Sequence, residues 1–153
     1  APFAIGFHPY FCYGEKVENL KLISNARTRY AKNQNKIPLQ PESVSGTKWD
    51  LSQGVRVGNT SLDDYFTDLD FDSGIAKTLL LTESGEGLGV WQDSSLPDLV
   101  IYTTDSYPGV DGPMHAIAIE PVAAPTNAFA SKERLPWIAP NQELRGSWGV
   151  RKI

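Results

Sequence analysis

The sequence predicts an all-β fold, an antiparallel β-sandwich built from about eight to ten short strands. Apolar and polar residues alternate at period two in several segments, as they do where one face of a strand is buried. Clusters of glycine, proline and serine separate these segments as turn signals. No segment has the spacing of a long amphipathic helix, and the sequence has no internal repeat. We therefore expect residues 1–153 to form a single β-sandwich region around one core.

The first predicted strand covers residues 1–11. Phe3, Ile5 and Phe7 share one face of it, whereas Ala4, Gly6 and His8 share the other. We expect the bulky face to fill the core, and Pro9 to bend or end the strand. Because the chain starts directly in a strand and without an initiator methionine, we expect it to be part of something larger.

The next segments alternate between short strands and connections. Strands are predicted over residues 19–24 and 28–32, the second with the pattern of an edge or half-exposed strand, and a turn over residues 33–36. Residues 37–48 contain two prolines and a glycine and are predicted to be a loop without a strand. In residues 62–69 the bulky apolar side chains recur at near-helical spacing, which fits either a short helical turn or a bent strand.

The middle of the chain has the clearest strand pattern. Three strands are predicted there, over residues 75–82, 87–92 and 98–103. Residues 107–113 are rich in glycine and proline, so a loop is expected. After an irregular stretch, a last strand is predicted over residues 144–151.

The strand that begins at His115 carries the most informative pattern. His115, Ile117 and Ile119 share one face, and Ala116, Ala118 and Glu120 share the other. The first face is bulky enough to fill a core, while the second leaves room beside a single carboxylate. Pro121 and Pro125 are expected to end this strand and stiffen the segment after it.

Composition narrows the possible partners. The chain has 14 Lys and Arg against 18 Asp and Glu, a net charge of −4, and no basic block, so neither nucleic acid nor a membrane surface is an expected partner. No apolar run is long enough to span a bilayer. Cys12 is the only cysteine, which precludes an internal disulfide and suits a reducing compartment such as the cytoplasm.

The common motifs for phosphate, metal or nucleophilic chemistry are missing from the sequence. It contains no glycine-rich phosphate loop, no Cys/His metal spacing and no Gly-x-Ser-x-Gly elbow. The acidic stretch from Asp63 to Asp72 lacks the glycine and the final Glu of an EF-hand loop. We therefore predict neither a metal nor a cofactor.

His8 and Glu120 remain as candidates for acid–base chemistry. Each ends a run of small residues on the face of its strand opposite the bulky one. An imidazole and a carboxyl on two sides of a substrate can transfer protons near neutral pH. The alternatives are that Glu120 is a solvated charge at a strand end and that His8 is a hydrogen-bonded structural group. Asp63, with Tyr65, could orient polar groups of a ligand.

Four segments, in chain order, resemble a known family. They are Ile5-Gly-Phe-His-Pro-Tyr-Phe11, Ser45-Gly-Thr-Lys-Trp-Asp-Leu51, Leu62-Asp-Asp-Tyr-Phe66 and Ala118-Ile-Glu-Pro-Val-Ala-Ala-Pro-Thr-Asn-Ala-Phe129. The set is similar to the C-terminal half of the aldose 1-epimerases, also called galactose mutarotases. The resemblance implies a large antiparallel sandwich, the galactose mutarotase-like supersandwich, of which this chain is expected to be a partial copy.

The resemblance also implies an activity and the residues that carry it. It implies that the chain interconverts the α and β anomers of a free hexose, an aldose sugar, by opening and reclosing the ring. Glu120 would be the base that takes the proton from the anomeric hydroxyl, and His8 would be the acid that protonates the ring oxygen. Asp63, Tyr10 and Tyr65 would bind the substrate.

Two other functions stay open at this point. The chain could be a non-catalytic carbohydrate-binding β-sandwich, although such a module needs neither His8 nor Glu120. It could also act on a hexose phosphate, for which Arg27, Arg29 and Lys48 are available. Because members of the family are longer, we expect the chain to be stable only with a missing N-terminal half or through self-association.

Overall fold

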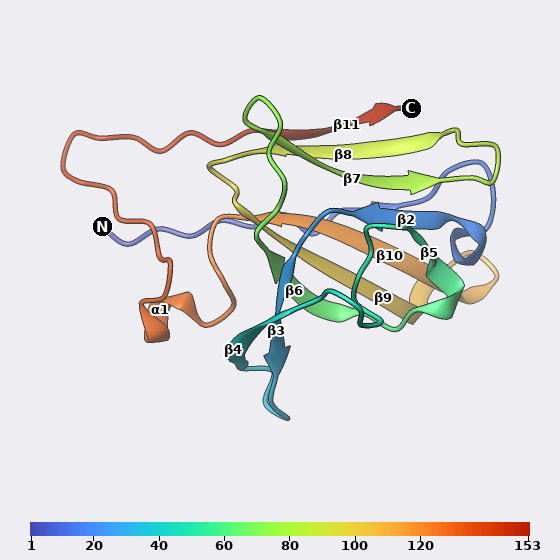
Figure 1. Cartoon of the computed structure of the whole chain (residues 1–153), viewed down its shortest axis with the longest axis horizontal. Helices are drawn as coiled ribbons and strands as arrows, with labels where there is room; N and C mark the ends of the chain where they lie inside the picture. The colour runs from blue at the N-terminus through green and yellow to red at the C-terminus, as the bar shows by residue number, and fades with distance from the viewer.

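The computed structural model describes all residues, 1–153, as two antiparallel sheets packed face to face (Figure 1). The six-stranded sheet contains, in spatial order, β1 (Tyr10–Phe11), β10 (Gly112–Val122), β9 (Asp98–Gly109), β6 (Asp63–Thr67), β3 (Thr28–Lys32) and β4 (Pro38–Ser43). The five-stranded sheet contains β11 (Trp148–Lys152), β8 (Gly87–Asp93), β7 (Ile75–Leu81), β2 (Lys21–Ser24) and β5 (Val55–Arg56). The helical pieces are η1 (Val17–Asn19), η2 (Val57–Asn59) and α1 (Ala128–Ser131). The predicted all-β sandwich is confirmed, and none of these helices is long and apolar enough to cross a membrane.

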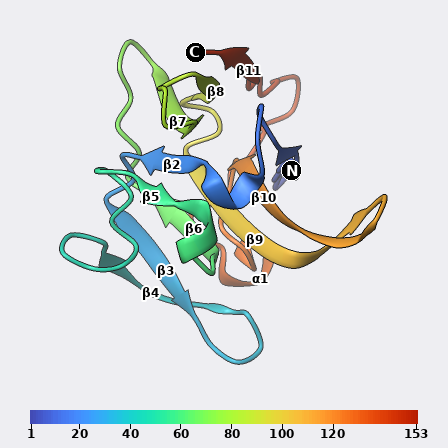
Figure 2. The ribbon, with the colours of Figure 1, turned by 90° about the vertical axis from the view of Figure 1, so that its right-hand side faces the viewer.

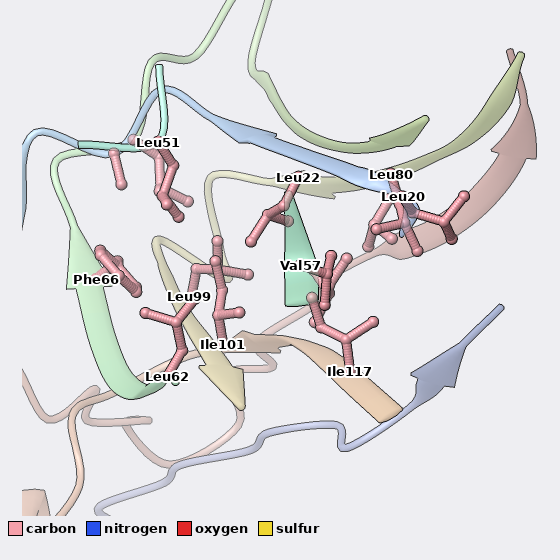
Figure 3. Packing of buried hydrophobic residues seen from close by; sticks show 14 of the residues in the cluster. Leu20, Leu22, Leu51, Val57, Leu62, Phe66, Leu80, Leu99, Ile101 and Ile117 are labelled. Atoms are coloured by element: carbon pink, nitrogen blue, oxygen red, sulfur yellow. The ribbon is translucent and has the colours of Figure 1, made fainter. Parts of the chain in front are cut away.

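The main core lies between the two sheets (Figure 3). Ile117 and Ile119 of β10 meet Leu99 and Ile101 of β9 there, and all four are fully buried. Burying an aliphatic side chain of this size contributes roughly 1.5–3 kcal/mol. The prediction that the isoleucine face of β10 fills the core is therefore confirmed, and the opposite face of the six-stranded sheet is left for polar residues.

The prediction of a loop over residues 37–48 is wrong for the first half of that segment, because Pro38–Ser43 form β4. This strand lies at the edge of its sheet, where proline is tolerated because only one side of the strand needs a ladder of hydrogen bonds. Strand β3 is correspondingly not an edge strand, since β4 and β6 flank it.

The ambiguous segment around Phe66 is a strand. Strand β6 pairs with β3 on one side and β9 on the other, and this pairing outweighs the near-helical spacing of its apolar residues. Phe66 is fully buried in the core. The strand ends before Asp68, whose backbone is in the left-handed region with φ 55°.

The loop predicted over residues 107–113 is wrong, because most of it belongs to the two longest strands. Tyr107 lies opposite Met114 and Gly109 opposite Gly112, so only Val110 and Asp111 remain as the turn. Figure 2 shows this β9–β10 hairpin projecting away from the rest of the six-stranded sheet. Strand β10 also continues through Pro121, which Leu99 faces on β9, so this proline does not end the strand.

The N-terminal segment differs from its prediction in two ways. Only Tyr10–Phe11 form a regular strand, while the residues before them follow the end of β10 through single bonds, such as Phe7 N–H to the Pro121 carbonyl at 3.2 Å. The bulky face does not enter the core either. Ile5 is 39% exposed and lines a surface groove with Phe3, Phe7 and other residues, because β10 and not this segment covers the main core.

The predicted strands over residues 75–82, 87–92 and 98–103 correspond to β7, β8 and the first half of β9. Strand β2 starts at Lys21, two residues later than expected, and β11 starts at Trp148 instead of residue 144. These shifts lie at element ends, where local patterns carry least information.

Candidate active site

The outer face of the six-stranded sheet collects residues from distant parts of the chain. Residues in register on neighbouring strands point to the same side of a pleated sheet. One row across the sheet runs Tyr10, Ala118, Tyr102, Asp63. The adjacent row runs Glu120, Val100, Tyr65, Tyr30. Because Ile117 and Ile119 point into the core, the residues that alternate with them are directed to this outer face.

His8 and Glu120 are in contact at the edge of this face. The imidazole Nε2 lies 3.2 Å from Oε1 of Glu120, and the side chains are 53% and 11% exposed. Two backbone hydrogen bonds hold the segment on either side of His8, from Phe7 N–H to the Pro121 carbonyl and from Ile119 N–H to the Pro9 carbonyl. The pairing of β10 with the N-terminal segment thus places the accessible imidazole against the nearly buried carboxyl.

The environment of Glu120 raises the pKa of its carboxyl group toward neutral pH. Burial raises the pKa of Glu120 from 4.5 to about 7. The positive charges of His8 and Lys32 oppose this rise in pKa, while the negative charge of Asp63 adds to it. A carboxyl group with a pKa close to 7 can both accept and release a proton at physiological pH, which suits a general base.

Tyrosine rings surround His8. Its ring centroid lies 5.0 Å from that of Tyr10 and 6.0 Å from that of Tyr102, and Tyr107 of the β9–β10 hairpin packs on Tyr10 at 4.6 Å. Ala118 lies opposite both Tyr10 and Tyr102 in the sheet and is fully buried. The space expected above the small residues of β10 is therefore lined by aromatic rings.

Asp63 occupies the same face two strands away from β10. Lys32 Nζ lies 2.6 Å from its Oδ1 and Lys36 Nζ lies 2.9 Å from its Oδ2, so each carboxylate oxygen binds one lysine. Burial acts to raise the pKa of Asp63, but the hydrogen bonds and charges of the two lysines outweigh it and hold that pKa below its usual value. Asp63 is therefore ionised and fixed in place on the sheet.

Tyr65 lies deeper than the other candidates. It is only 2% exposed, and its hydroxyl donates a hydrogen bond to Asp98, which is fully buried. Asp98 also accepts hydrogen bonds from Thr67 at 2.6 Å and from Arg134 at 2.5 Å. Burial raises the pKa of both Tyr65 and Asp98. The Tyr65 hydroxyl thus belongs to a buried hydrogen-bond network on the same face of the sheet as Glu120.

Sequence reasoning missed several polar residues on this face, namely Lys32, Asp98, Tyr102 and Arg134. Asp98 and Tyr102 could have been found by continuing the alternation of β9, in which they share a face with Val100. Lys32 has no comparable local signal, because its proximity to Asp63 depends on which strands are neighbours in the sheet.

The basic residues considered for a phosphate group lie elsewhere. Arg29 belongs to the opposite face of the sheet, where it binds Asp64 at 2.6 Å and stacks on the Trp49 ring. Lys48 also lies over the ring of Trp49, and Arg27 pairs with Asp70 at 4.0 Å. None of these contacts involves Glu120.

The other histidine forms a separate pair. His115 Nδ1 lies 2.6 Å from Asp105 within the β9–β10 hairpin. The structure has no group of three or more His, Cys, Asp or Glu side chains arranged to hold a metal ion.

The fold and these contacts define an antiparallel β-sandwich with an imidazole–carboxyl pair on the polar face of its larger sheet. The chain belongs to the aldose 1-epimerase family, whose sequence model matches residues 1–150. A search of curated proteins gives no match.

Solved structures share this fold. A galactose mutarotase-like protein from Clostridium acetobutylicum superposes with a TM-score of 0.74 at 16% identity, over 99% of this chain and 48% of that one. A GalM/aldose epimerase homologue from C. elegans gives 0.61 at 18% identity, over 79% of this chain and 42% of that one. The chain thus spans about half the length of these structures. The coverage does not confirm the prediction that the matching part is the C-terminal half.

Proposed function

We propose that this chain carries the acid–base site of an aldose 1-epimerase that interconverts the α and β anomers of a free hexose. The observation that supports this best is the 3.2 Å contact between His8 and Glu120, on a face where burial places the pKa of Glu120 near 7. Family membership supports the reaction type. A module that only binds sugar has no use for a carboxyl group prepared in this way.

The proposed reaction transfers two protons, and it breaks and re-forms the bond between C1 and the ring oxygen. Glu120 removes the proton from the anomeric hydroxyl at C1, and protonated His8 donates a proton to the ring oxygen as the bond between that oxygen and C1 breaks. The open aldehyde then rotates about the C1–C2 bond. Reclosure on the other carbonyl face returns the first proton from Glu120 to the anomeric oxygen and the second from the ring oxygen to His8. The reaction needs no cofactor, because only protons are transferred.

The arrangement of the outer face supports a position for the sugar. Asp63 and Glu120 lie two strand spacings apart and two residues apart along the strands, about 12 Å, with Val100 and Tyr102 of β9 between them. A hexose bound over β9 would present its anomeric carbon to Glu120 and its remote hydroxyls to Asp63. Tyr10, which stacks on His8, would contact the ring near the acid. Tyr65 would support the sugar site indirectly, because its hydroxyl donates a hydrogen bond to the buried Asp98 beneath the surface of this face.

Polarimetry of freshly dissolved α-D-glucose and α-D-galactose tests the proposal. We expect the chain to accelerate mutarotation above the spontaneous rate and Glu120→Gln to reduce the catalysed rate by roughly 10²–10⁴-fold, the usual contribution of a general base. Sugar binding, measured by NMR titration, should persist in the variant. Glu143→Gln, which neutralises a carboxylate that is 72% exposed, should leave the rate unchanged.

Two results would contradict this function. A chain that binds the sugar without accelerating mutarotation at any concentration would be a binding module. A Glu120→Gln variant with the wild-type rate would show that Glu120 is not the base. Raising the concentration of the chain also tests whether a second copy is needed, since the chain spans only 48% of the Clostridium acetobutylicum structure.

A further inference from the structure

Lys32 is the most buried cation on the outer face near Glu120. It is the last residue of β3, and its side chain is 17% exposed, whereas that of Lys36 is 74% exposed. A lysine side chain normally keeps its ammonium group in water, so one held this deeply requires a partner. Its partner is Asp63, with Nζ 2.6 Å from Oδ1.

The carboxyl groups of Asp63 and Glu120 lie on the same face of the six-stranded sheet. Their strands are separated only by β9, and both side chains point to the outer face. Two like charges on a partly buried surface, on residues about 12 Å apart, disfavour the ionisation of whichever is harder to ionise. Glu120 is that group, because its side chain is 11% exposed and that of Asp63 is 40% exposed.

We propose that Lys32 is a positioning residue of the acid–base site, which holds Asp63 in place and offsets its negative charge as seen by Glu120. The catalytic consequence rests on the proposed function of Glu120 as the base. Lys32 supplies a fixed charge here, whereas Lys36 reaches the other oxygen of Asp63 on an exposed side chain from the β3–β4 turn. The positive charge of Lys32 lowers the pKa of Glu120 and the negative charge of Asp63 raises it, which agrees with this geometry.

Other titratable or charged groups lie on the same face of the sheet as Glu120. They come from every neighbouring element: His8 from the N-terminal segment, Tyr10 from β1, Tyr102 and Asp98 from β9, Tyr65 from β6 and Arg134 from the segment after α1. None of them forms a hydrogen bond or an ion pair with Lys32, so a substitution at Lys32 changes the charge near Asp63 and leaves these contacts in place.

The proposal is tested by titrating Glu120 directly. The side-chain carboxyl carbon of Glu120 is followed by NMR with ¹³C-labelled glutamate, and its signal is assigned as the one missing from Glu120→Gln. Removing one charge about 12 Å away at an effective dielectric constant of about 20 shifts a titration midpoint by on the order of one pH unit. We expect Lys32→Met to raise the midpoint by about this amount, and Asp63→Asn to lower it.

Controls separate this effect from a structural one. Lys32→Arg keeps the charge and should leave the midpoint within about 0.3 unit of the wild type, while the double variant Lys32→Met/Asp63→Asn should return close to it. Lys36→Met should give a smaller shift than Lys32→Met, because its ammonium group is screened by water. Lys77→Met, on β7 of the other sheet, should not move the midpoint.

The same variants give a second reading in the rate of mutarotation. The limb of the pH–rate profile that reports the base should move in the same direction as the Glu120 titration. A midpoint that stays unchanged in both Lys32→Met and Asp63→Asn overturns the proposal. If Lys32→Met fails to fold, Lys32→Gln, which also removes the charge, is titrated in its place. If the wild type does not accelerate mutarotation, the proposed function fails, while the titration separately supports or overturns the role of Lys32.

Discussion

Replacing Glu120 with glutamine should make the protein more stable at neutral and alkaline pH. The folded state raises the pKa of Glu120 from 4.5 to about 7, so it binds this proton more tightly than the unfolded chain does. Wild-type stability therefore falls as the pH rises from about 4.5 to about 7, and the loss is complete above that range. The difference of about 2.5 units, at 1.36 kcal/mol per unit, corresponds to about 3 kcal/mol. Glutamine has a similar shape and no charge, so the variant avoids this loss.

Urea denaturation followed by tryptophan fluorescence measures the effect, since the chain has four tryptophans. The free energy of unfolding of Glu120→Gln should match that of the wild type at about pH 4 and exceed it by about 3 kcal/mol at about pH 8. Glu143→Gln, at an exposed carboxylate, should change stability by less than about 0.5 kcal/mol at both pH values. A Glu120→Gln variant that is equally stable or less stable at pH 8 would show that folding does not oppose the charge on Glu120, and would refute the reasoning.

Three further substitutions test the core and the buried polar networks. Ile117→Ala should lower the free energy of unfolding by about 2–5 kcal/mol in urea denaturation, because this side chain is fully buried between the sheets; a loss below about 1 kcal/mol would contradict that packing. Arg29→Met should cost about 3–5 kcal/mol, since it leaves the buried carboxylate of Asp64 without its partner, and a neutral result would mean that water reaches Asp64. Asp98→Asn should cost about 2 kcal/mol by weakening its bond to Arg134, and unchanged thermal unfolding would contradict this role.

The strands were predictable where a residue's burial is decided within its own strand. The alternation of β10 identified Ile117 and Ile119 as core residues, and it placed Glu120 on the other face, because a strand has only two faces. Local signals failed where pairing with a distant strand decides the structure. Strand β4 forms despite Pro38 and Pro41, since an edge strand can place residues without an N–H where no ladder bond is needed.

The site was predictable only in part for the same reason. His8 and Glu120 stood out by the small residues before them and by their family motifs, and the structure brings them into contact. Lys32 and Asp63 are 31 residues apart, and they meet because β3 and β6 are neighbours in a particular register. Neither the neighbour nor the register can be derived from the composition of either strand.

Stability and the proposed chemistry meet in strand β10. Its alternation puts the isoleucines into the core, and the same pairing with β9 and the N-terminal segment buries Glu120 on the other face. That burial is the largest cause of the raised pKa, so the packing that anchors the strand also prepares the carboxyl group. Glu120→Gln is expected to recover about 3 kcal/mol, which is therefore the energetic cost of keeping a carboxyl group with a pKa near 7 on this strand. Moving the carboxyl to a flexible, exposed loop would avoid this cost, but it would also return the pKa toward 4.5 and lose the fixed contact with His8.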